Sequence, residues 1–239
     1  MSRYYRDDAV VLRTYKLGEA DRIVILATKT RGKVRAVAKG VRRTKSKFGS
    51  RLEPLSHVAL QLYEGRNLDI ITQAETIESH RGIREDLDRY ASAVGVLEVV
   101  DQLSLEGESD ARRFAMVTGV LRTLARTDHP LVVPAFYLKL LAHEGVQPEV
   151  DACVTCGSPG PLVAIDIVVG GMLCAEHRQG RAVSEEALHV IRAVLDGQVA
   201  TLLGEAPPAV SGEVAALATD AVEHLLERRL RTPSVLRHD

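Results

Sequence analysis

The sequence predicts an α+β protein in which a small β-barrel precedes an α-helical domain. Three observations support this prediction. Short runs of alternating apolar and polar residues fill the first 78 positions, a pattern typical of strands. From about residue 83 the apolar residues recur every three or four positions, as they do on one face of a helix. Between two of these helical stretches, three cysteines and a histidine stand in metal-ligand spacing.

Five short β-type runs make up the predicted barrel. Turn signals around Gly18, Gly32 and Gly65 separate them. Because the runs follow one another without a helix between them, a closed barrel of the OB-fold type is favoured over a sandwich. We expect this domain to span residues 1–78. The predicted strands are Ala9–Tyr15, Arg22–Thr28, Val34–Lys39, His57–Tyr63 and Leu68–Gln73.

Alternation along the strands assigns side chains to the two faces of the barrel wall. The residues expected inside are Val34, Ala36 and Ala38 in the third strand, Val10 and Leu12 in the first, and Val58, Leu60 and Leu62 in the fourth. Those expected outside are Lys33, Arg35, Val37 and Lys39, then Arg13 and Tyr15, then His57, Gln61 and Tyr63. The outer wall is therefore predicted to be basic, with scattered tyrosines.

The net charge of −1 conceals a strong asymmetry along the chain. Residues 1–50 contain fourteen Lys and Arg against four Asp and Glu, a net charge of +10. The remaining 189 residues contain seventeen against twenty-eight, a net charge of −11. This asymmetry predicts a polyanionic partner for the barrel only.

Residues 41–51 (VRRTKSKFGSR) have no usable periodicity and are interpreted as a mobile basic loop. Its cations can follow a phosphate backbone, and Phe48 is a candidate for stacking on a base, as are Tyr15 and Tyr63. The alternatives are a solvated loop without a ligand and half-buried tyrosines. A basic strand face adjoins a basic loop here, which favours phosphate contact with weak sequence preference.

The second domain, residues 79–239, is predicted to be helical. Its expected helices are Ile83–Leu105, a helix around Phe114–Leu124, Leu131–Glu144, Ser184–Gly197 and Ser211–Leu230, with Ser184 and Ser211 as N-caps. Glu98 and Asp101 lie on or near the core-facing stripe of the first of these helices. We interpret them as paired buried or rim carboxylates, not as general bases.

The segment at residues 150–180 carries Cys153-x-x-Cys156 and Cys174-x-x-His177 around a short apolar run, Leu162–Val169. A closed Cys3His set is the usual ligand set of structural Zn²⁺, and it leaves no open position for a catalytic water. The metal is expected to hold this inserted segment against the helices. A thioredoxin-like redox motif and a coincidental spacing are the alternatives.

The sequence contains no catalytic constellation: no Walker loop, no GxGxxG with a downstream acid and no GxSxG motif. We therefore expect a protein that is not an enzyme. No apolar run is long enough to cross a membrane, and the N-terminus lacks a signal-peptide core. Cysteines in ligand spacing without a signal peptide indicate the reducing cytoplasm.

Several N-terminal motifs, taken together, resemble the bacterial recombination and repair family RecO, in its zinc-containing branch. They are Val10-Val-Leu-Arg-Thr, Gly18-Glu-Ala-Asp-Arg-Ile-Val, Thr28-Lys-Thr-Arg-Gly-Lys, Val37-Ala-Lys-Gly-Val-Arg-Arg and Ser46-Lys-Phe-Gly-Ser-Arg-Leu-Glu-Pro-Leu. The later Gln73-Ala-Glu and the cysteine segment extend the resemblance over nearly the whole chain.

The resemblance implies an OB-fold followed by a zinc-carrying helical domain. It also implies a non-catalytic mediator that binds single- and double-stranded DNA, anneals complementary strands and, with the partner RecR, loads RecA onto DNA coated by single-strand-binding protein, the RecFOR route. Contact with the acidic C-terminal tail of that coating protein is implied as well. The expected DNA contacts are Lys33, Arg35, Lys39, Arg42, Arg43, Lys45 and Lys47, with Arg13 and Arg22 as further candidates.

Two other functions share the same charge pattern. An OB-fold RNA-binding protein would present the same basic wall. A zinc-stabilised adaptor would use it to contact acidic protein partners. A metal hydrolase is disfavoured because the predicted ligand set is closed.

Overall fold

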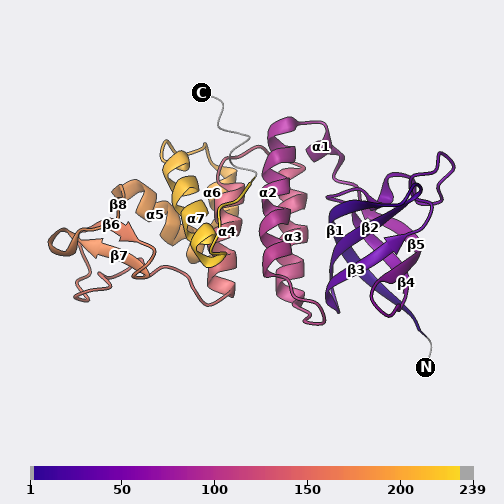
Figure 1. Ribbon diagram of the computed structural model, residues 1–239. Coiled ribbons are helices and arrows are strands. Elements are labelled where there is room, and N and C mark those ends of the chain that lie inside the picture. The colour runs from indigo at the N-terminus through magenta and orange to yellow at the C-terminus, as the bar shows by residue number, and fades with distance from the viewer. Residues whose placement is uncertain (1–2, 232–239) are drawn as a thin grey trace. The chain divides into compact units, whose positions relative to one another are not determined.

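The computed structural model describes residues 3–231 (Figure 1). The described residues form two compact units, here called the first unit (residues 3–126 with 230–231) and the second unit (residues 127–229). The domain boundary predicted after residue 78 falls at the end of the last barrel strand. That residues 1–78 form a domain by themselves remains a prediction. Within residues 3–231, no helix has the length and apolar character needed to span a membrane.

The first unit begins with a closed five-stranded barrel, as predicted (Figure 1). The strand order is β1-β2-β3-β5-β4, in which β3 and β5 are parallel and the other pairs are antiparallel. This closure leaves no open sheet edge. The strands are β1 (Tyr4–Leu17), β2 (Asp21–Thr28), β3 (Gly32–Ala38), β4 (His57–Tyr63) and β5 (Asp69–Glu78).

The barrel interior confirms the predicted faces of β3 and β4 but not that of β1. The predicted inward residues of β3 and β4 all lie in the buried core cluster. In β1 that cluster contains Ala9 and Val11, whereas Val10 and Leu12 are buried on the outer side of the wall. The prediction for β1 was wrong because Ala9–Leu12 is apolar on both faces, and a bulge between Val11 and Arg13 shifts the register.

The basic segment between β3 and β4 is anchored to the barrel. Val41, Phe48 and Leu52 belong to the core cluster, and a short 3₁₀ turn, η1 (Gly49–Leu52), follows Phe48. Phe48 is only 1% exposed, so the predicted base-stacking role for it was wrong. A single aromatic residue in a polar run carries no periodic signal that would reveal its burial. The cations between Val41 and Phe48 are held at both ends of the run.

Three helices complete the described part of the first unit: α1 (Arg81–Arg84), α2 (Leu87–Leu103) and α3 (Ala111–Leu124). The predicted start at Ile83 was too early because the Asp86 side chain caps α2, accepting bonds from the backbone N–H groups of residues 88 and 89. Asp110 caps α3 in the same way. His57 of β4 packs edge-on against Phe114 of α3, and burial lowers the pKa of this histidine.

A buried carboxylate joins α2 to the barrel. Asp101 has a side chain only 5% exposed, and its carboxylate lies 2.6 Å from Nε of Arg13 and 3.2 Å from Nζ of Lys33. The contact with Lys33 is an ion pair without hydrogen-bond alignment, since the Oδ1 atom has no hydrogen-bond partner. The interpretation of Asp101 as a paired buried carboxylate agrees with this geometry.

Asp101→Asn is expected to lower the free energy of unfolding of the first unit by about 2 kcal/mol. The change leaves two cations beside a neutral amide, and removing one member of a buried pair costs about 3–5 kcal/mol. Arg13 is half exposed, so water screens part of that cost. Urea denaturation checks this value, and Asp88→Asn, at an exposed aspartate of the same helix, is the control. Equal stability of both variants would contradict a structural role for Asp101.

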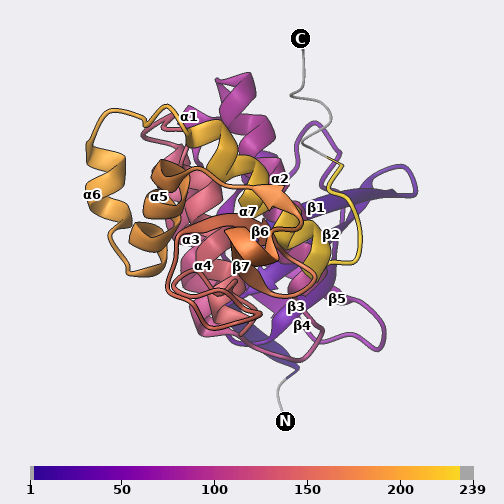
Figure 2. The same ribbon diagram turned by 90° about the vertical axis from the view of Figure 1, so that its left-hand side faces the viewer.

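The second unit contains α4 (Val132–His143), α5 (Glu185–Leu195), α6 (Val199–Gly204) and α7 (Ser211–Leu225) (Figure 2). Ser184 caps α5 as predicted, since its Oγ accepts a bond from the backbone N–H of Ala187 at 3.2 Å. Ser211 was wrongly predicted as a cap: it is the first residue of α7, and its Oγ donates to the carbonyl of Pro208 at 2.6 Å. α6 was not predicted, because six residues are too few to show a helical period in the sequence.

Candidate metal centre and nucleic-acid interface

A small antiparallel sheet supports the predicted metal segment in the second unit. Its strands are β6 (Leu162–Asp166), β7 (Gly171–Cys174) and β8 (Arg181–Ala182), in the order β7-β6-β8. The apolar run predicted between the two ligand pairs thus forms β6. Cys174 ends β7, and a 3₁₀ turn, η2 (Ala175–His177), brings His177 back beside it.

The first ligand pair lies on a tight turn. The carbonyl of Cys153 accepts a bond from the N–H of Gly157 at 2.8 Å, and Gly157 has a φ of +73°. A glycine suits this left-handed conformation because it has no Cβ to clash with the backbone. The N–H of Val154 donates to the carbonyl of Met172 at 3.0 Å, which ties the turn to β7.

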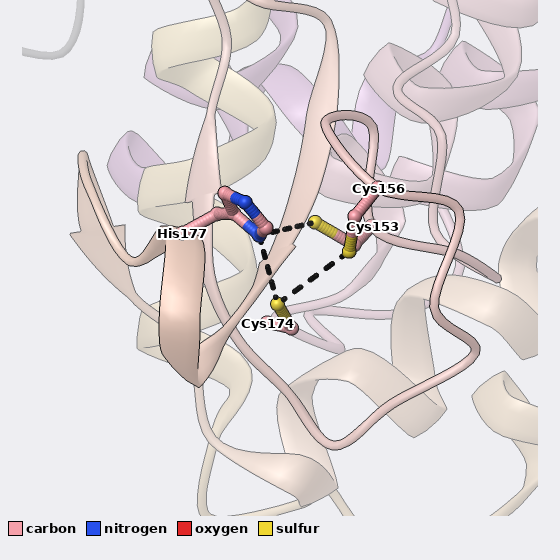
Figure 3. Close-up of side chains that lie close together, drawn as sticks. All are labelled: Cys153, Cys156, Cys174 and His177. Atoms are coloured by element: carbon pink, nitrogen blue, oxygen red, sulfur yellow. Dashed lines mark hydrogen bonds between the residues drawn. The ribbon is translucent and has the colours of Figure 1, made fainter.

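The four predicted ligands converge on one point (Figure 3). Their ligand atoms all lie within 4.8 Å of one another. The Sγ atoms of Cys156 and Cys174 are 3.8 Å apart, and Nδ1 of His177 lies 3.3 Å from the Sγ of Cys174 and 4.0 Å from that of Cys153. Around a tetrahedral zinc ion these separations would be roughly 3.8 Å between sulfurs and roughly 3.5 Å between sulfur and nitrogen. The donor set therefore fits a metal ion of this size.

The surroundings of Cys153 favour its thiolate form. Burial raises the pKa of this thiol, but backbone N–H groups of the turn and of Cys174 outweigh that effect and lower the pKa to about 6. A thiolate is the form that binds a metal ion. Cys153 and Cys174 are buried, whereas Cys156 is exposed. The cluster of four candidate ligands is thus partly open to solvent, on the side of Cys156.

Polar contacts also fasten the segment to the helices of the second unit. Arg192 of α5 donates to the carbonyl of Val150 at 2.6 Å and 3.0 Å. At the other end, Oγ and the N–H of Ser184 donate to the carboxylate of Glu213 on α7, each at 2.7 Å. The four candidate ligands therefore lie on a segment that has a sheet of its own and is bonded to the neighbouring helices.

The predicted DNA-contact residues divide into two groups in the first unit. Arg13, Arg22 and Lys33 are engaged with carboxylates: the first and last with Asp101, and Arg22 with Glu53 at 2.7 Å. The others have exposed side chains, and within residues 3–231 only Arg35 among them forms an ion pair, a long one of 3.9 Å with exposed Glu106; they are Arg35, Lys39, Arg42, Arg43, Lys45 and Lys47.

Two of the exposed cations are positioned by main-chain carbonyls. Arg42 donates to the carbonyl of Glu19 at 3.0 Å, and Lys47 donates to that of Thr72 at 2.7 Å. A carbonyl bond orients a cation without cancelling its charge. β3 and the segment after it therefore present a continuous series of cations.

Arg31 and Arg66 are among the exposed arginines of the same unit that were not predicted as DNA contacts. Arg31 lies in the turn between β2 and β3, and Arg66 lies in the turn between β4 and β5. Alternation along a strand carries no information about side chains in turns. The excess of arginine and lysine in the first fifty residues was the only signal that included Arg31.

Comparisons with known proteins cover almost the whole chain. Residues 1–80 match the family model described as "Recombination protein O N terminal". Residues 84–234 match the one described as "Recombination protein O C terminal". The junction between the two falls between β5 and α2 of the first unit.

Individual proteins of similar length are also similar in sequence to this chain. The chain is 44% identical to the DNA repair protein RecO of Streptomyces griseus over 82% of this chain and 84% of that protein. It is 43% identical to the DNA repair protein RecO of Streptomyces coelicolor over 95% and 96%. The corresponding protein of Streptomyces avermitilis is 42% identical over the same shares. With both family models matched and this degree of identity, the chain belongs to the recombination protein O (RecO) family.

Proposed function

We propose that this protein is a non-catalytic mediator of DNA repair that binds DNA without sequence specificity and anneals complementary strands. The barrel with its continuous exposed cations carries the proposal. Cations on a rigid wall neutralise phosphates and so reduce the repulsion between two strands. Nothing in this arrangement reads base edges, which suits a protein that must act on any sequence.

The proposed DNA surface consists of the exposed cations of β3 and the following segment. Arg35 and Lys39 are its centre, and Arg42, Arg43, Lys45 and Lys47 extend it. Arg13, Arg22 and Lys33 were expected to contribute too. Because carboxylates already engage them, we propose that they mainly stabilise the barrel and its contact with α2.

We further propose that Cys153, Cys156, Cys174 and His177 hold a structural Zn²⁺. Three thiolates and one imidazole form a closed tetrahedral set, and a closed set supplies stability without a reactive position. The ion would fix the two ligand turns at the edge of the sheet. This role accords with a mediator that does no chemistry.

The proposed partners follow the family resemblance: RecR, RecA and the C-terminal tail of single-strand-binding protein, in the cytoplasm at sites of repair. The relatives are named DNA repair proteins, which supports this setting. An adaptor that contacts only acidic proteins and an OB-fold RNA-binding protein are the rival functions, and the experiment below separates them.

The double variant Arg35→Ala/Lys39→Ala is expected to weaken binding to every DNA sequence alike and to lose annealing of oligonucleotides coated with single-strand-binding protein. Two lost phosphate contacts lower the slope of log K against log salt by about 1.4 for single strands. Fluorescence anisotropy across a salt series measures the slope, and a strand-pairing assay measures annealing.

Arg6→Ala, a change at an exposed arginine of β1 that lines a different groove, is a control for the general effect of a lost positive charge on the barrel. A loss confined to one DNA sequence would contradict the proposed mechanism. Wild-type protein that is folded and metal-loaded yet accelerates no annealing would favour the adaptor. Stronger competition by RNA than by DNA of the same sequence would favour the RNA-binding function.

A further inference from the structure

A groove opens at the end of the barrel where β3 begins. It has a volume of about 440 Å³ and is lined by the turn between β2 and β3, the turn between β4 and β5, and residues 106 and 107. The cations along it are Arg31, Lys33, Arg35 and Arg66. Lys33 is engaged with Asp101, which leaves three arginine side chains facing solvent on its rim.

Arg31 is held in a fixed orientation within this groove. Its guanidinium lies over the ring of Tyr5, 3.8 Å from the ring centroid. The hydroxyl of Tyr5 in turn donates to the carboxylate of Asp69. Burial and this bond raise the pKa of Tyr5 well above its ordinary value, so the hydroxyl stays a donor. A guanidinium stacked on a fixed ring keeps its N–H groups at the edge, in the arrangement that suits bidentate contact with a phosphate.

The carboxylates near these arginines hold them loosely. Glu64 lies 4.0 Å from Arg31, and Glu106 lies 3.9 Å from Arg35. In both pairs the two side chains are about half exposed. Ion pairs of this length at the surface contribute little, about 0–1 kcal/mol. A phosphate group can therefore replace either carboxylate at small cost.

The groove also continues the proposed DNA surface. Arg31 immediately precedes β3, Arg35 lies on its outward face and Lys39 follows its end. Seven residues of strand span about 23 Å, a length that accommodates the roughly four nucleotides of the smallest OB-fold sites. The three cations thus mark the two ends and the middle of one path.

We propose that this groove binds the phosphodiester backbone of a single DNA strand, with Arg31 and Arg66 as its phosphate contacts and Glu64 and Glu106 as competing anions that limit its affinity. This inference rests on the proposed function. It adds a second set of contacts at the opposite end of β3 from the basic segment. It also assigns the two turn arginines a role that the strand pattern did not indicate.

The test is the double variant Arg31→Ala/Arg66→Ala, measured with fluorescein-labelled oligothymidylate across a salt series. We expect at least about a fivefold loss of affinity and a slope of log K against log salt lower by about 1.4, the value for two phosphate contacts on a single strand. Arg6→Ala is the matched control, because Arg6 is an exposed arginine of the same barrel that lines a different groove. Circular dichroism and thermal unfolding confirm that each variant is folded.

A second variant changes affinity in the opposite direction. Glu64→Gln/Glu106→Gln removes the two exposed competing charges and leaves the Asp69 carboxylate, which Tyr5 holds. We expect this variant to bind the oligonucleotide at least about threefold more tightly at low salt, where the competition is least screened. Glutamine keeps the length of the side chain. It also leaves the backbone of residues 105 and 106, which pairs with β3, unchanged.

The outcomes separate the two proposals. If Arg35→Ala/Lys39→Ala weakens binding while Arg31→Ala/Arg66→Ala behaves like Arg6→Ala, the groove proposal is overturned and the proposed function stands. If the wild-type protein binds no DNA at all, both proposals fail. If the groove variant loses affinity for duplex DNA but keeps it for oligothymidylate, the groove does not bind a single strand as proposed.

Discussion

Protein carrying Cys174→Ser is expected to be purified without a stoichiometric metal ion and with residues 150–180 open to proteolysis. Cys174 is buried, and its Sγ atom lies within contact distance of both Cys156 and His177. Its replacement therefore removes a sulfur that contacts two of the other three candidate ligands. Apparent zinc-binding free energies in small peptides are about 10–16 kcal/mol. The stability of a whole domain is about 5–15 kcal/mol, so the loss of one ligand is large on this scale.

Elemental analysis of the purified protein and limited proteolysis measure the two effects. α5 and α7 are expected to stay folded, because they pack against each other and against α4 and do not depend on the four ligands. Glu176→Gln is the matched control, since Glu176 is an exposed residue between two ligands. Retention of one metal equivalent by Cys174→Ser would show that the Cys3His set is not the metal site.

Phe48→Ala is expected to lower the free energy of unfolding of the first unit by about 3–5 kcal/mol. Phe48 is among the largest fully buried side chains of the chain's described part. Its truncation leaves a cavity that the closed barrel is poorly able to collapse. DNA affinity is expected to fall as well, because Phe48 anchors one end of the run that carries Arg42 to Lys47. Urea denaturation followed by circular dichroism measures the stability.

Phe48→Leu is the conservative companion and is expected to cost less than about 1.5 kcal/mol. Both variants lack the aromatic ring, but leucine keeps much of the buried volume. Comparing the two variants therefore separates the effect of core packing from that of stacking on a base. If Phe48→Leu is stable but loses DNA affinity as severely as Phe48→Ala, the ring itself contacts the bases, and the buried position described here is not the one used on DNA.

The barrel strands were predictable where only one face of the strand is buried, because the buried residues then recur at every second position. β4 was predicted with its observed bounds, His57–Tyr63, since Val58, Leu60 and Leu62 are buried and alternate with partly exposed residues. β1 was predicted too short and with the wrong inner face. Its middle residues are buried on both sides of the wall, so alternation there is lost, and no local signal marks the bulge.

The Cys3His cluster was easier to predict from the sequence than the proposed DNA surface. The convergence of Cys153, Cys156, Cys174 and His177 on one point was predicted because their spacing is local to two turns. Whether each cation is paired with a carboxylate was not predictable, because the carboxylate can lie far away in the sequence. Arg13 and Lys33 are paired with Asp101, which lies in a helix that follows the whole barrel. A positive charge on a strand face indicates a basic surface only where no such partner reaches it.

The division of the chain into units has a consequence for its synthesis. The chain leaves the first unit after Arg126 and rejoins it at Leu230. Leu230 is buried there, and the N–H of Arg231 donates to the Glu98 carboxylate of α2 at 3.1 Å. On a translating ribosome, α2 therefore emerges long before the residues that complete its surroundings. Residues 150–180 leave the exit tunnel in the interval, so the second unit can fold, and take up the proposed ion, while the first unit still lacks its final contact.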